Sequence, residues 1–219
     1  MLTDAQEDYT RGFVPFLGVQ IFLDSRPLIP RSETEYWVEK ALEIIPRTGA
    51  LRVLDLFSGS GCIGVAALKH RPNTSATCAE LEPRHLPTIK KNIEVNEINP
   101  NRVSIVQSDV WSNVAGLFEY IFANPPYVSE KRGTASHDAL IHEPHEALFA
   151  HDDGFEYIAK TIEGLPRYLV QHGTAWIEHE PFHTQRILEC ATSHKLHVTT
   201  HTDQYGVERY SQLTHIPVA

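Results

Sequence analysis

DLFSGSGCIG, residues 55–64, joins a predicted strand at residues 51–57 to a predicted helix at residues 63–70. Glycines at such a junction let the backbone turn tightly and approach a ligand without a Cβ in the way. No Lys-Ser or Lys-Thr pair follows them, so the turn is not a phosphate-binding P-loop. Gly59, Gly61 and Gly64 do fit the spacing of a dinucleotide-binding turn, which keeps a nicotinamide enzyme open as an alternative.

Outward from this turn, strand and helix patterns alternate along the chain. Strands are predicted at residues 51–57, 76–81, 103–107, 120–123, 174–178, 196–201 and 209–214, and helices at residues 63–70, 84–96, 155–170 and 184–193. Alternation with short connections predicts an α/β fold, with a mainly parallel seven-stranded sheet and helices on both faces. The last two strands have no helix between them, which predicts one antiparallel strand at the sheet edge.

Two further patterns precede the glycine-rich turn. Residues 16–23 alternate crudely in polarity around Gly18 and predict a hairpin or an extended arm. Ser32 and Glu35 have the spacing of a capping box, and the apolar stripe that follows predicts a helix ending near Pro46. We therefore expect an N-terminal arm at residues 1–31 and one catalytic domain at residues 32–219.

The composition favours one globular α/β domain and limits its partners. Of the 219 residues, 42% are hydrophobic, and 19 basic residues stand against 28 acidic ones, a formal net charge of −9. Lys and Arg must replace counterions on a nucleic-acid backbone, so this balance disfavours loose binding there, although it does not exclude a local basic groove. The acidic N-terminus lacks the pattern of a signal peptide, and no apolar run approaches the roughly 20 residues that span a bilayer.

The cysteines and histidines give no sign of a metal site. Three widely spaced cysteines without a CxxC pair predict neither a disulfide framework nor zinc, and they favour a reducing, cytoplasmic setting. Four histidines crowd one region, but their spacing fits no common zinc pattern, so we expect surface or loop positions: His137, His142, His145 and His151.

Polar residues follow successive predicted strands. Glu80 ends the second strand, about twenty residues past the glycines, where an acid can accept both hydroxyls of a ribose. Asp109 follows the third strand, where a carboxylate can accept from an adenine amino group, and Asn124 follows the fourth. Ligands of open parallel sheets bind at the carboxyl ends of the strands, so we expect these residues to meet at one cleft.

Asn124-Pro125-Pro126-Tyr127 is the motif that points to a reaction. Its prolines fix φ and lack amide donors, which leaves rigid carbonyl acceptors, while Asn124 adds a side-chain acceptor and Tyr127 a flat face. Such a site suits an NH₂ group on an sp² carbon, as in an amide, adenine or cytosine. Acceptors that hold its two hydrogens would align this poor nucleophile for methyl transfer from a sulfonium, without a strong general base. The alternative is a simple loop-terminating turn.

Over nearly its whole length the chain resembles the HemK/PrmC family, the release-factor glutamine methyltransferases. LIPRSETE at residues 28–35 is similar to that family's LIPRPETE, and VLDLFSGSGCIG, AELEP, QSDVW and NPPYV follow in the family order. Residues 142–155 resemble its EPxxAL and DGL segment, and residues 176–178 with Gln185 resemble its last strand and helix start. NPPY alone is shared with adenine and cytosine amino-methyltransferases, whereas LIPRxETE together with EPxxAL is not.

The resemblance implies a Rossmann-like, class I S-adenosylmethionine-dependent methyltransferase. It implies that the cofactor is held at its ribose by Glu80, at its methionine end by Ser58, Gly59, Ser60 and Gly61, and at its adenine by Asp109 and Val110, with Phe57, Leu81 and Asn124 completing the cofactor set. It further implies that the acceptor amide is held by Asn124, Pro125, Pro126 and Tyr127. No metal is expected.

The chain departs from the family pattern at a few places. Phe57 stands where the family usually has glycine, Ser32 replaces a proline and Glu180 a glycine. Only about a dozen residues precede the predicted hairpin, so we expect the catalytic domain without the family's helical N-terminal domain. We also expect the arm at residues 13–30 and the segment at residues 129–142 to flank the pocket mouth.

Three functions follow from these observations. The first is methylation of the side-chain amide nitrogen (N5) of the glutamine in the Gly-Gly-Gln motif of a peptide-chain release factor, by a monomeric, cytoplasmic enzyme. The second is methylation of an exocyclic nitrogen in RNA or DNA, which the net charge and the lack of a recognition domain disfavour. The third is a catalytically idle binding protein, which the intact glycines, acids and NPPY motif disfavour.

Overall fold

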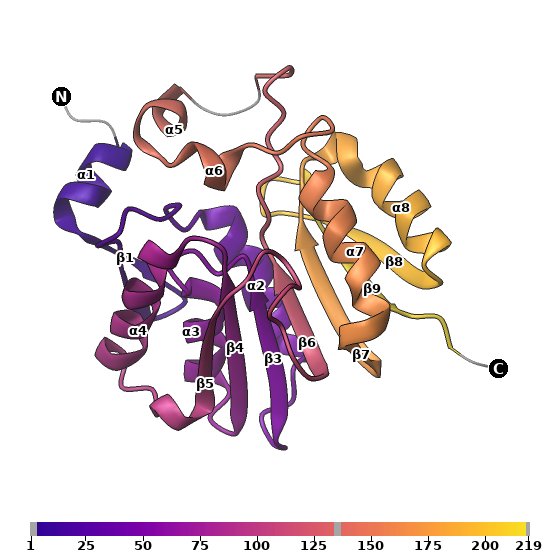
Figure 1. The fold of residues 1–219 in the computed structure, drawn as a ribbon, viewed down its shortest axis with the longest axis horizontal. Helices are drawn as coiled ribbons and strands as arrows, with labels where there is room; N and C mark the ends of the chain where they lie inside the picture. Colours follow the sequence, from indigo (N-terminus) through magenta and orange to yellow (C-terminus); the bar gives the residue numbers. More distant parts are fainter. Residues whose placement is uncertain (1–3, 134–136, 218–219) are drawn as a thin grey trace.

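The computed structural model describes residues 4–133 and 137–217, and within them it forms one central seven-stranded sheet (Figure 1). The strand order is β5-β4-β3-β6-β7-β9-β8. These strands are β3 (Leu51–Leu56), β4 (Thr74–Glu80), β5 (Val103–Gln107), β6 (Phe118–Ala123), β7 (Leu169–Glu178), β8 (Leu196–Thr202) and β9 (Glu208–His215). The predicted mainly parallel sheet with one antiparallel strand is confirmed.

The position of the antiparallel strand differs from the prediction. β9 pairs antiparallel with both β7 and β8, so it lies inside the sheet, and the edge strand β8 runs parallel to the rest. The tight Asp203–Val207 hydrogen bond closes the turn between β8 and β9, which forces these two strands into a hairpin. The predicted edge position was wrong. The lack of a helix between the last two strands indicates that they pair antiparallel with each other, but it does not indicate which of the two pairs with β7.

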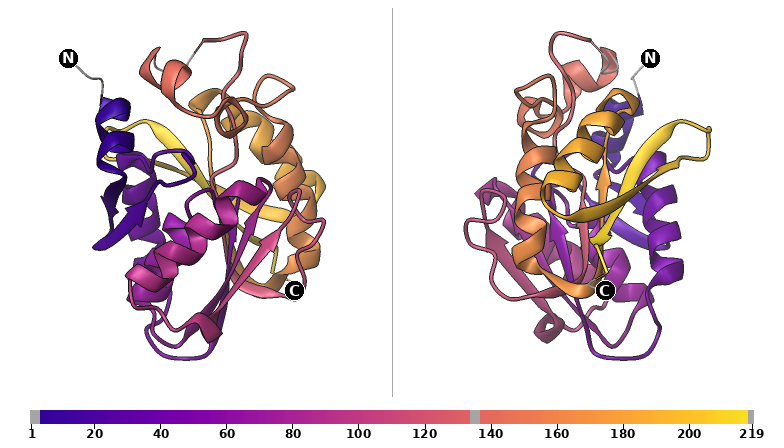
Figure 2. Two further views of the ribbon diagram at one scale, coloured as in Figure 1. Left: turned by 60° about the vertical axis from the view of Figure 1, so that its left-hand side comes forward. Right: turned by 90° about the vertical axis from the view of Figure 1, so that its right-hand side faces the viewer.

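Helices cover both faces of the sheet, as predicted (Figure 2). One face carries α2 (Ser32–Ile44), α3 (Cys62–His70) and α4 (Leu86–Val95), and the other carries α7 (Glu156–Tyr168) and α8 (Thr184–Ser193). Side chains alternate along a strand, so Val53 packs in the first layer while Leu54 packs in the second, both almost fully buried. Both faces of β3 are therefore core.

The N-terminal segment folds onto the first layer. The predicted hairpin forms from β1 (Phe13–Phe16) and β2 (Val19–Phe22), and Phe16 and Ile21 join the same hydrophobic cluster as α2 and α3. The side-chain amide of Asn92 on α4 pairs with both backbone groups of Phe22, and Asn96 pairs in the same way with Gln20. These amides satisfy the outer edge of β2 and fix the hairpin against α4.

Two N-terminal expectations need correction. Residues 4–11, where no helix was predicted, form α1 (Asp4–Arg11). The predicted capping box at Ser32 and Glu35 is wrong, because Arg31 occupies the N-cap and no side chain caps α2. The Glu35 carboxylate instead accepts from the backbone N–H of Leu17 at 2.6 Å. Leu17 lies in the hairpin turn with φ 45°, so its N–H takes a partner from outside the hairpin.

Above the carboxyl ends of the strands lie two short helices that the sequence did not predict, α5 (His137–His142) and α6 (His145–Leu148) (Figure 1). The remaining elements are single 3₁₀ turns, η1 (Pro83–His85), η2 (Pro100–Arg102) and η3 (Pro181–His183). Among the described residues there is no helix long and apolar enough to cross a bilayer, and no cluster of side chains suited to a metal ion. Cys62, Cys78 and Cys190 are free thiols.

Candidate active site

A cavity of about 280 Å³ opens at the carboxyl ends of β3, β4, β5 and β6. Each of these strands contributes side chains from the loop that follows it, and α6, α7 and the N-terminal arm contribute the rest. The predicted site residues that line it are Phe57, Gly59, Glu80, Leu81, Asp109, Val110, Asn124 and Pro126. The other predicted residues do not line it: Ser58, Ser60, Gly61, Pro125 and Tyr127.

The glycine-rich turn shapes one wall of the cavity through its backbone. Gly59 and Gly61 have φ of 54° and 78°, in the left-handed region that favours glycine. Phe57 also has a positive φ, 64°, although it carries a Cβ. Such a residue costs on the order of 1–2 kcal/mol relative to an ordinary backbone conformation. The phenylalanine thus occupies a position for which the family glycine is better suited, and its ring lies 5.8 Å from that of Tyr157 across the cavity wall.

The base of the turn is a buried hydrogen-bonded unit. The Gly64 N–H donates to Asp55 Oδ2 at 2.9 Å, and the Ser58 hydroxyl donates to the Asp55 carbonyl at 2.7 Å. The pKa of Asp55 is raised to about 7, chiefly by burial and also by the negative charge of Glu80, while the hydrogen bonds from Gly64 and Ser58 oppose the shift. A Cβ on Gly64 would lie 2.8 Å from the Cys78 sulfur, so only glycine fits here. The Gly64 position therefore serves close packing of α3 on β4.

Glu80 stands at the end of β4 with its carboxylate held by the backbone on both sides. Oε2 accepts from the Gly59 N–H at 2.6 Å, and Oε1 accepts from the Glu82 N–H at 2.8 Å. The side chain is largely buried, which raises the pKa of Glu80, while the two backbone donors oppose that shift. A carboxylate has about four acceptor positions. Two therefore remain for a ligand in the cavity.

The third strand end brings Asp109 and Val110 to the cavity beside Ser108. Val110 has φ 48°, which is rare for a β-branched residue. The Ser108 hydroxyl donates to the Val110 carbonyl at 2.8 Å and so helps to hold this conformation. Asp109 is exposed at the cavity rim. The geometry matches the order of strand ends from which the sequence predicted a binding cleft.

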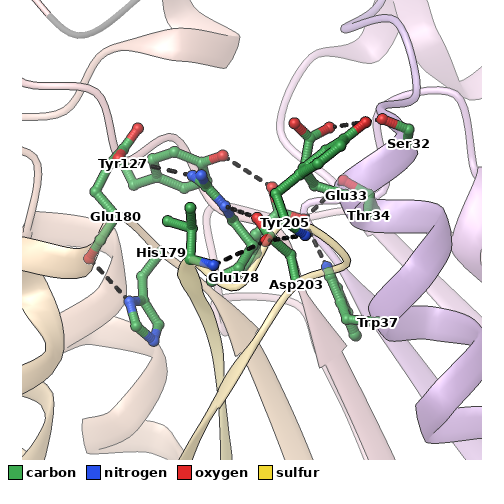
Figure 3. Close-up of polar contacts among 12 residues, drawn as sticks. Ser32, Glu33, Thr34, Trp37, Tyr127, Glu178, His179, Glu180, Asp203 and Tyr205 are labelled. Carbon is green, nitrogen blue, oxygen red and sulfur yellow. Dashed lines mark hydrogen bonds and ion pairs between the residues drawn. The ribbon is translucent and has the colours of Figure 1, made fainter.

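The NPPY motif follows β6. Asn124 and Pro126 line the cavity, while Pro125 is buried and does not line it. The Asn124 side-chain NH₂ donates to the Thr34 hydroxyl oxygen at 3.2 Å. The half-buried Tyr127 donates its hydroxyl to Glu178 at 2.8 Å (Figure 3). Burial, and then the neighbouring Glu178 carboxylate, raise the pKa of Tyr127 well above its usual value. Tyr127 is therefore a neutral hydrogen-bond donor at physiological pH.

His85 is a cavity residue that sequence reasoning missed. It is 3% exposed and lines the cavity from η1. The Ser25 hydroxyl lies 2.7 Å from His85 Nδ1, and the Thr88 hydroxyl donates to Ser25 Oγ. Burial lowers the pKa of His85 to about 4, so the imidazole is neutral at physiological pH. The cavity wall thus holds a neutral imidazole whose partners are remote in sequence.

The segments that flank the cavity are joined by Glu143. Its carboxylate accepts from the Ile29 N–H at 3.1 Å and pairs with the Arg31 guanidinium. LIPR and HEP, two stretches on which the family resemblance rests, therefore meet in space. Leu28 of the arm and Glu130 of the segment after NPPY line the cavity, as expected. Residues 134–136 of that segment lie outside the described residues.

Comparison with known proteins shows the family and the fold of this chain. A family model described as "Methyltransferase small domain" matches residues 40–154. Solved structures with the same fold include a methyltransferase from Pyrococcus furiosus, with TM-score 0.66 and 21% identity over 90% of this chain and 88% of that one. The N-terminal domain of human METTL16 in complex with SAH has TM-score 0.60 and 15% identity over 92% of this chain and 77% of that one. The chain thus belongs to the methyltransferase small domain family and has the class I methyltransferase fold.

Curated relatives show to which methyltransferase family the chain belongs. The release factor glutamine methyltransferase of Streptococcus pneumoniae is 33% identical over 92% of this chain and 72% of its own length. That of Flavobacterium psychrophilum is 31% identical over 92% of this chain and 72% of its own length. The chain belongs to the release factor glutamine methyltransferase family, as the resemblance of the sequence predicted.

Proposed function

We propose that this protein transfers a methyl group from S-adenosylmethionine to the side-chain amide nitrogen of a glutamine, the one in the Gly-Gly-Gln motif of a peptide-chain release factor. The observation that carries the proposal is one cavity lined both by a buried carboxylate at the end of β4, Glu80, and by Asn124 and Pro126 of the NPPY motif after β6. Family membership over 92% of the chain supports the same substrate.

The cavity fits S-adenosylmethionine by the chemistry of its walls. Two acceptor positions on Glu80 are available for the two ribose hydroxyls, and the positive-φ turn at Gly59 lets the backbone approach the methionine end. The rest of that turn does not line the cavity in this arrangement: Ser58, Ser60 and Gly61. Phe57 and Leu81 flank the sugar, and Asp109 and Val110 face the adenine.

The chain's residues contribute orientation and electrostatics to the transfer. When bound, S-adenosylmethionine supplies a methyl group that its sulfonium already activates. Asn124 Oδ1 and the carbonyl acceptors of Pro125 and Pro126 hold the two hydrogens of the acceptor NH₂. These acceptors stabilise the positive charge that develops on the nitrogen, so no strong general base is required before transfer. The neutral Tyr127 is the last residue of the motif, and its hydrogen bond to Glu178 holds it in place.

The substrate loop must be narrow and flexible to reach this site. Asn124 lies in the cavity and not on an open face, so an amide side chain has to enter deeply. Glycines on both sides of the entering residue allow the backbone to follow it. The arm that carries Leu28 and the segment that carries Glu130 stand at the mouth. The arm boundary at residue 31, the monomeric state and the cytoplasmic location stay predictions from the sequence.

The test is methylation of purified release factor with labelled S-adenosylmethionine, followed by mass spectrometry of the Gly-Gly-Gln peptide. We expect one added methyl group on that glutamine. Asn124→Ala should lower turnover by about two orders of magnitude, the scale of losing one positioned polar group from a transition state. Asn101→Ala is the matched control, because Asn101 is exposed in η2 at the opposite end of the sheet. Label in RNA or DNA, with none in the factor, would favour the nucleic-acid alternative.

A further inference from the structure

Glu178 is a buried carboxylate that collects three side-chain donors. It ends β7, is 1% exposed and lies beside Tyr127 of the NPPY motif (Figure 3). Oε2 accepts from the Thr34 hydroxyl at 2.7 Å and from the Trp37 indole N–H at 2.6 Å. Oε1 accepts from the Tyr127 hydroxyl at 2.8 Å. The donors come from α2 and from the motif itself, so this one group joins the two.

The direction of each hydrogen bond in this cluster follows from Glu178 being an ionised carboxylate: burial raises its pKa, and the bonds from Thr34, Trp37 and Tyr127 oppose that shift. A carboxylate only accepts and an indole N–H only donates. The Thr34 hydroxyl has a single proton, which it gives to Glu178, so towards any other neighbour its oxygen can only accept. The neighbour is the Asn124 side chain at 3.2 Å, which must therefore present its NH₂ to Thr34. Asn124 lines the cavity, and the atom left to face it is the carbonyl oxygen Oδ1.

The orientation of this amide decides what the site can bind. An amide rotated by half a turn would place its NH₂ in the cavity, where the acceptor nitrogen of a glutamine also presents hydrogens. Two donors would then oppose each other, and the acceptor NH₂ would lose one of its holding groups. Thr34 prevents this rotation because it donates its own proton to Glu178, which leaves its oxygen as an acceptor for the Asn124 NH₂ group.

We propose that Thr34 and Glu178 are a positioning pair, which holds the Asn124 amide with its oxygen towards the cavity. The role of this oxygen in methyl transfer rests on the proposed function, whereas the orientation itself does not. Thr34 is 1% exposed, and neither residue of the pair lines the cavity. Both act through Asn124 and not on the substrate.

The matched substitutions are Thr34→Val and Thr34→Ser. Valine keeps the branched shape without the hydroxyl, so Asn124 loses its acceptor, whereas serine keeps the hydroxyl. With release factor and S-adenosylmethionine, Thr34→Val should lower kcat about ten-fold or more. The Kd for S-adenosylmethionine should stay within about two-fold of the wild-type value, since Glu80 is untouched. Thr34→Ser should restore kcat to within about three-fold. Full kcat in Thr34→Val would overturn the proposal.

A second readout does not depend on activity. The side-chain ¹⁵N–¹H₂ signal of Asn124, assigned by its loss in Asn124→Ala, should exchange slowly with solvent in the wild type and in Thr34→Ser. It should exchange fast in Thr34→Val. Tyr127→Phe, which removes another donor to Glu178, should leave this signal protected. If the wild-type signal exchanges as fast as that of the exposed Asn101, the pair does not hold the amide and the proposal is wrong, whether or not Thr34→Val folds.

The two readouts separate this proposal from the proposed function. A wild-type protein that transfers no methyl to the release factor, but protects the Asn124 amide through Thr34, would support the positioning pair and refute the substrate. An active wild-type protein with an unprotected amide would do the reverse.

Discussion

Replacing Glu80 by glutamine is a sharper test of the cofactor site than replacing it by alanine. Both carboxylate oxygens accept a backbone N–H, from Gly59 and from Glu82. A glutamine has one oxygen and one NH₂ group, so one of these two backbone donors would face another donor. The change therefore weakens the tether of the glycine-rich turn and removes one of the two oxygens available to the ribose, without opening a cavity.

The size of the effect follows from the bonds that change. A hydrogen bond to a charged group contributes about 1.5–3 kcal/mol, and the ribose loses one such acceptor. Each 1.4 kcal/mol corresponds to a factor of ten in Kd, so we expect binding to weaken by about ten- to a hundred-fold. The loosened turn adds to this loss, because Gly59 must be ordered again when the ligand binds.

Isothermal titration calorimetry with S-adenosylmethionine measures the change directly. Glu119→Gln is the matched control, because Glu119 also accepts a backbone N–H, from Arg52 at 2.7 Å, but stands near the amino end of β6, far from the cavity. Its Kd should stay within about two-fold of wild type. Unchanged affinity in Glu80→Gln would show that this carboxylate does not hold the ribose. Tight binding of NADH by the wild type would instead support the dinucleotide alternative.

Two further predictions concern stability. Gly154 has φ 85°, and a Cβ there would collide with the Tyr127 carbonyl oxygen, so Gly154→Ala should displace the NPPY backbone, lowering both the melting temperature and kcat. Gly116→Ala, with φ 95° and open space around it, measures the backbone strain alone and should leave kcat unchanged. Burial lowers the pKa of His85 and of His179 from 6.5 to about 4, so between these values the unfolded chain binds protons that the folded chain does not. The contribution of these two histidines to the free energy of unfolding should therefore fall as pH decreases from 6.5 towards 4, by at most about 1.4 kcal/mol per pH unit for each. Burial raises the pKa of Asp55 to about 7, so this carboxyl contributes in the opposite direction over the same range, and denaturant titrations of the wild type and His85→Gln at pH 7 and pH 5 isolate the histidine contribution. His85→Gln should destabilise the fold less at pH 5 than at pH 7, and an equal effect at the two pH values would contradict burial of a neutral imidazole.

The sheet could be predicted because its signal is local. Alternation of apolar strands with amphipathic helices predicts a parallel sheet, and all seven predicted strands are present. The position of β9 between β7 and β8 could not be predicted, since it depends on which edge of a hairpin packs against the sheet. α1 has one buried residue, Ala5, and most of its other residues are polar, so no set of apolar residues marks it in the sequence. The capping box was wrong because a partner remote in sequence, the hairpin turn at Leu17, binds Glu35.

The residues of the candidate site likewise include some that could be predicted from the sequence and some that could not. Residues at strand ends could be predicted, because the carboxyl ends of parallel strands meet wherever such a sheet forms. Glu80 and Asn124 are of this kind. His85 and Thr34 depend on partners that the fold brings together: Ser25 lies 60 residues before His85, and Glu178 lies 144 residues after Thr34. No short motif contains both members of either pair.

Glu80 and Glu178 show how the number of occupied acceptor positions separates binding from positioning. Both are largely buried carboxylates at the carboxyl ends of parallel strands. In Glu80, which lines the cavity, backbone donors occupy two of about four acceptor positions, so the remaining two can take a ligand. In Glu178, Thr34, Trp37 and Tyr127 occupy three acceptor positions. Because Glu178 is 1% exposed, its fourth acceptor position cannot reach a substrate. Substitution of Glu80 should therefore change mainly the Kd for S-adenosylmethionine. Loss of the bonds to Glu178 should change mainly kcat, because those bonds orient Asn124 and Tyr127 and hold no ligand.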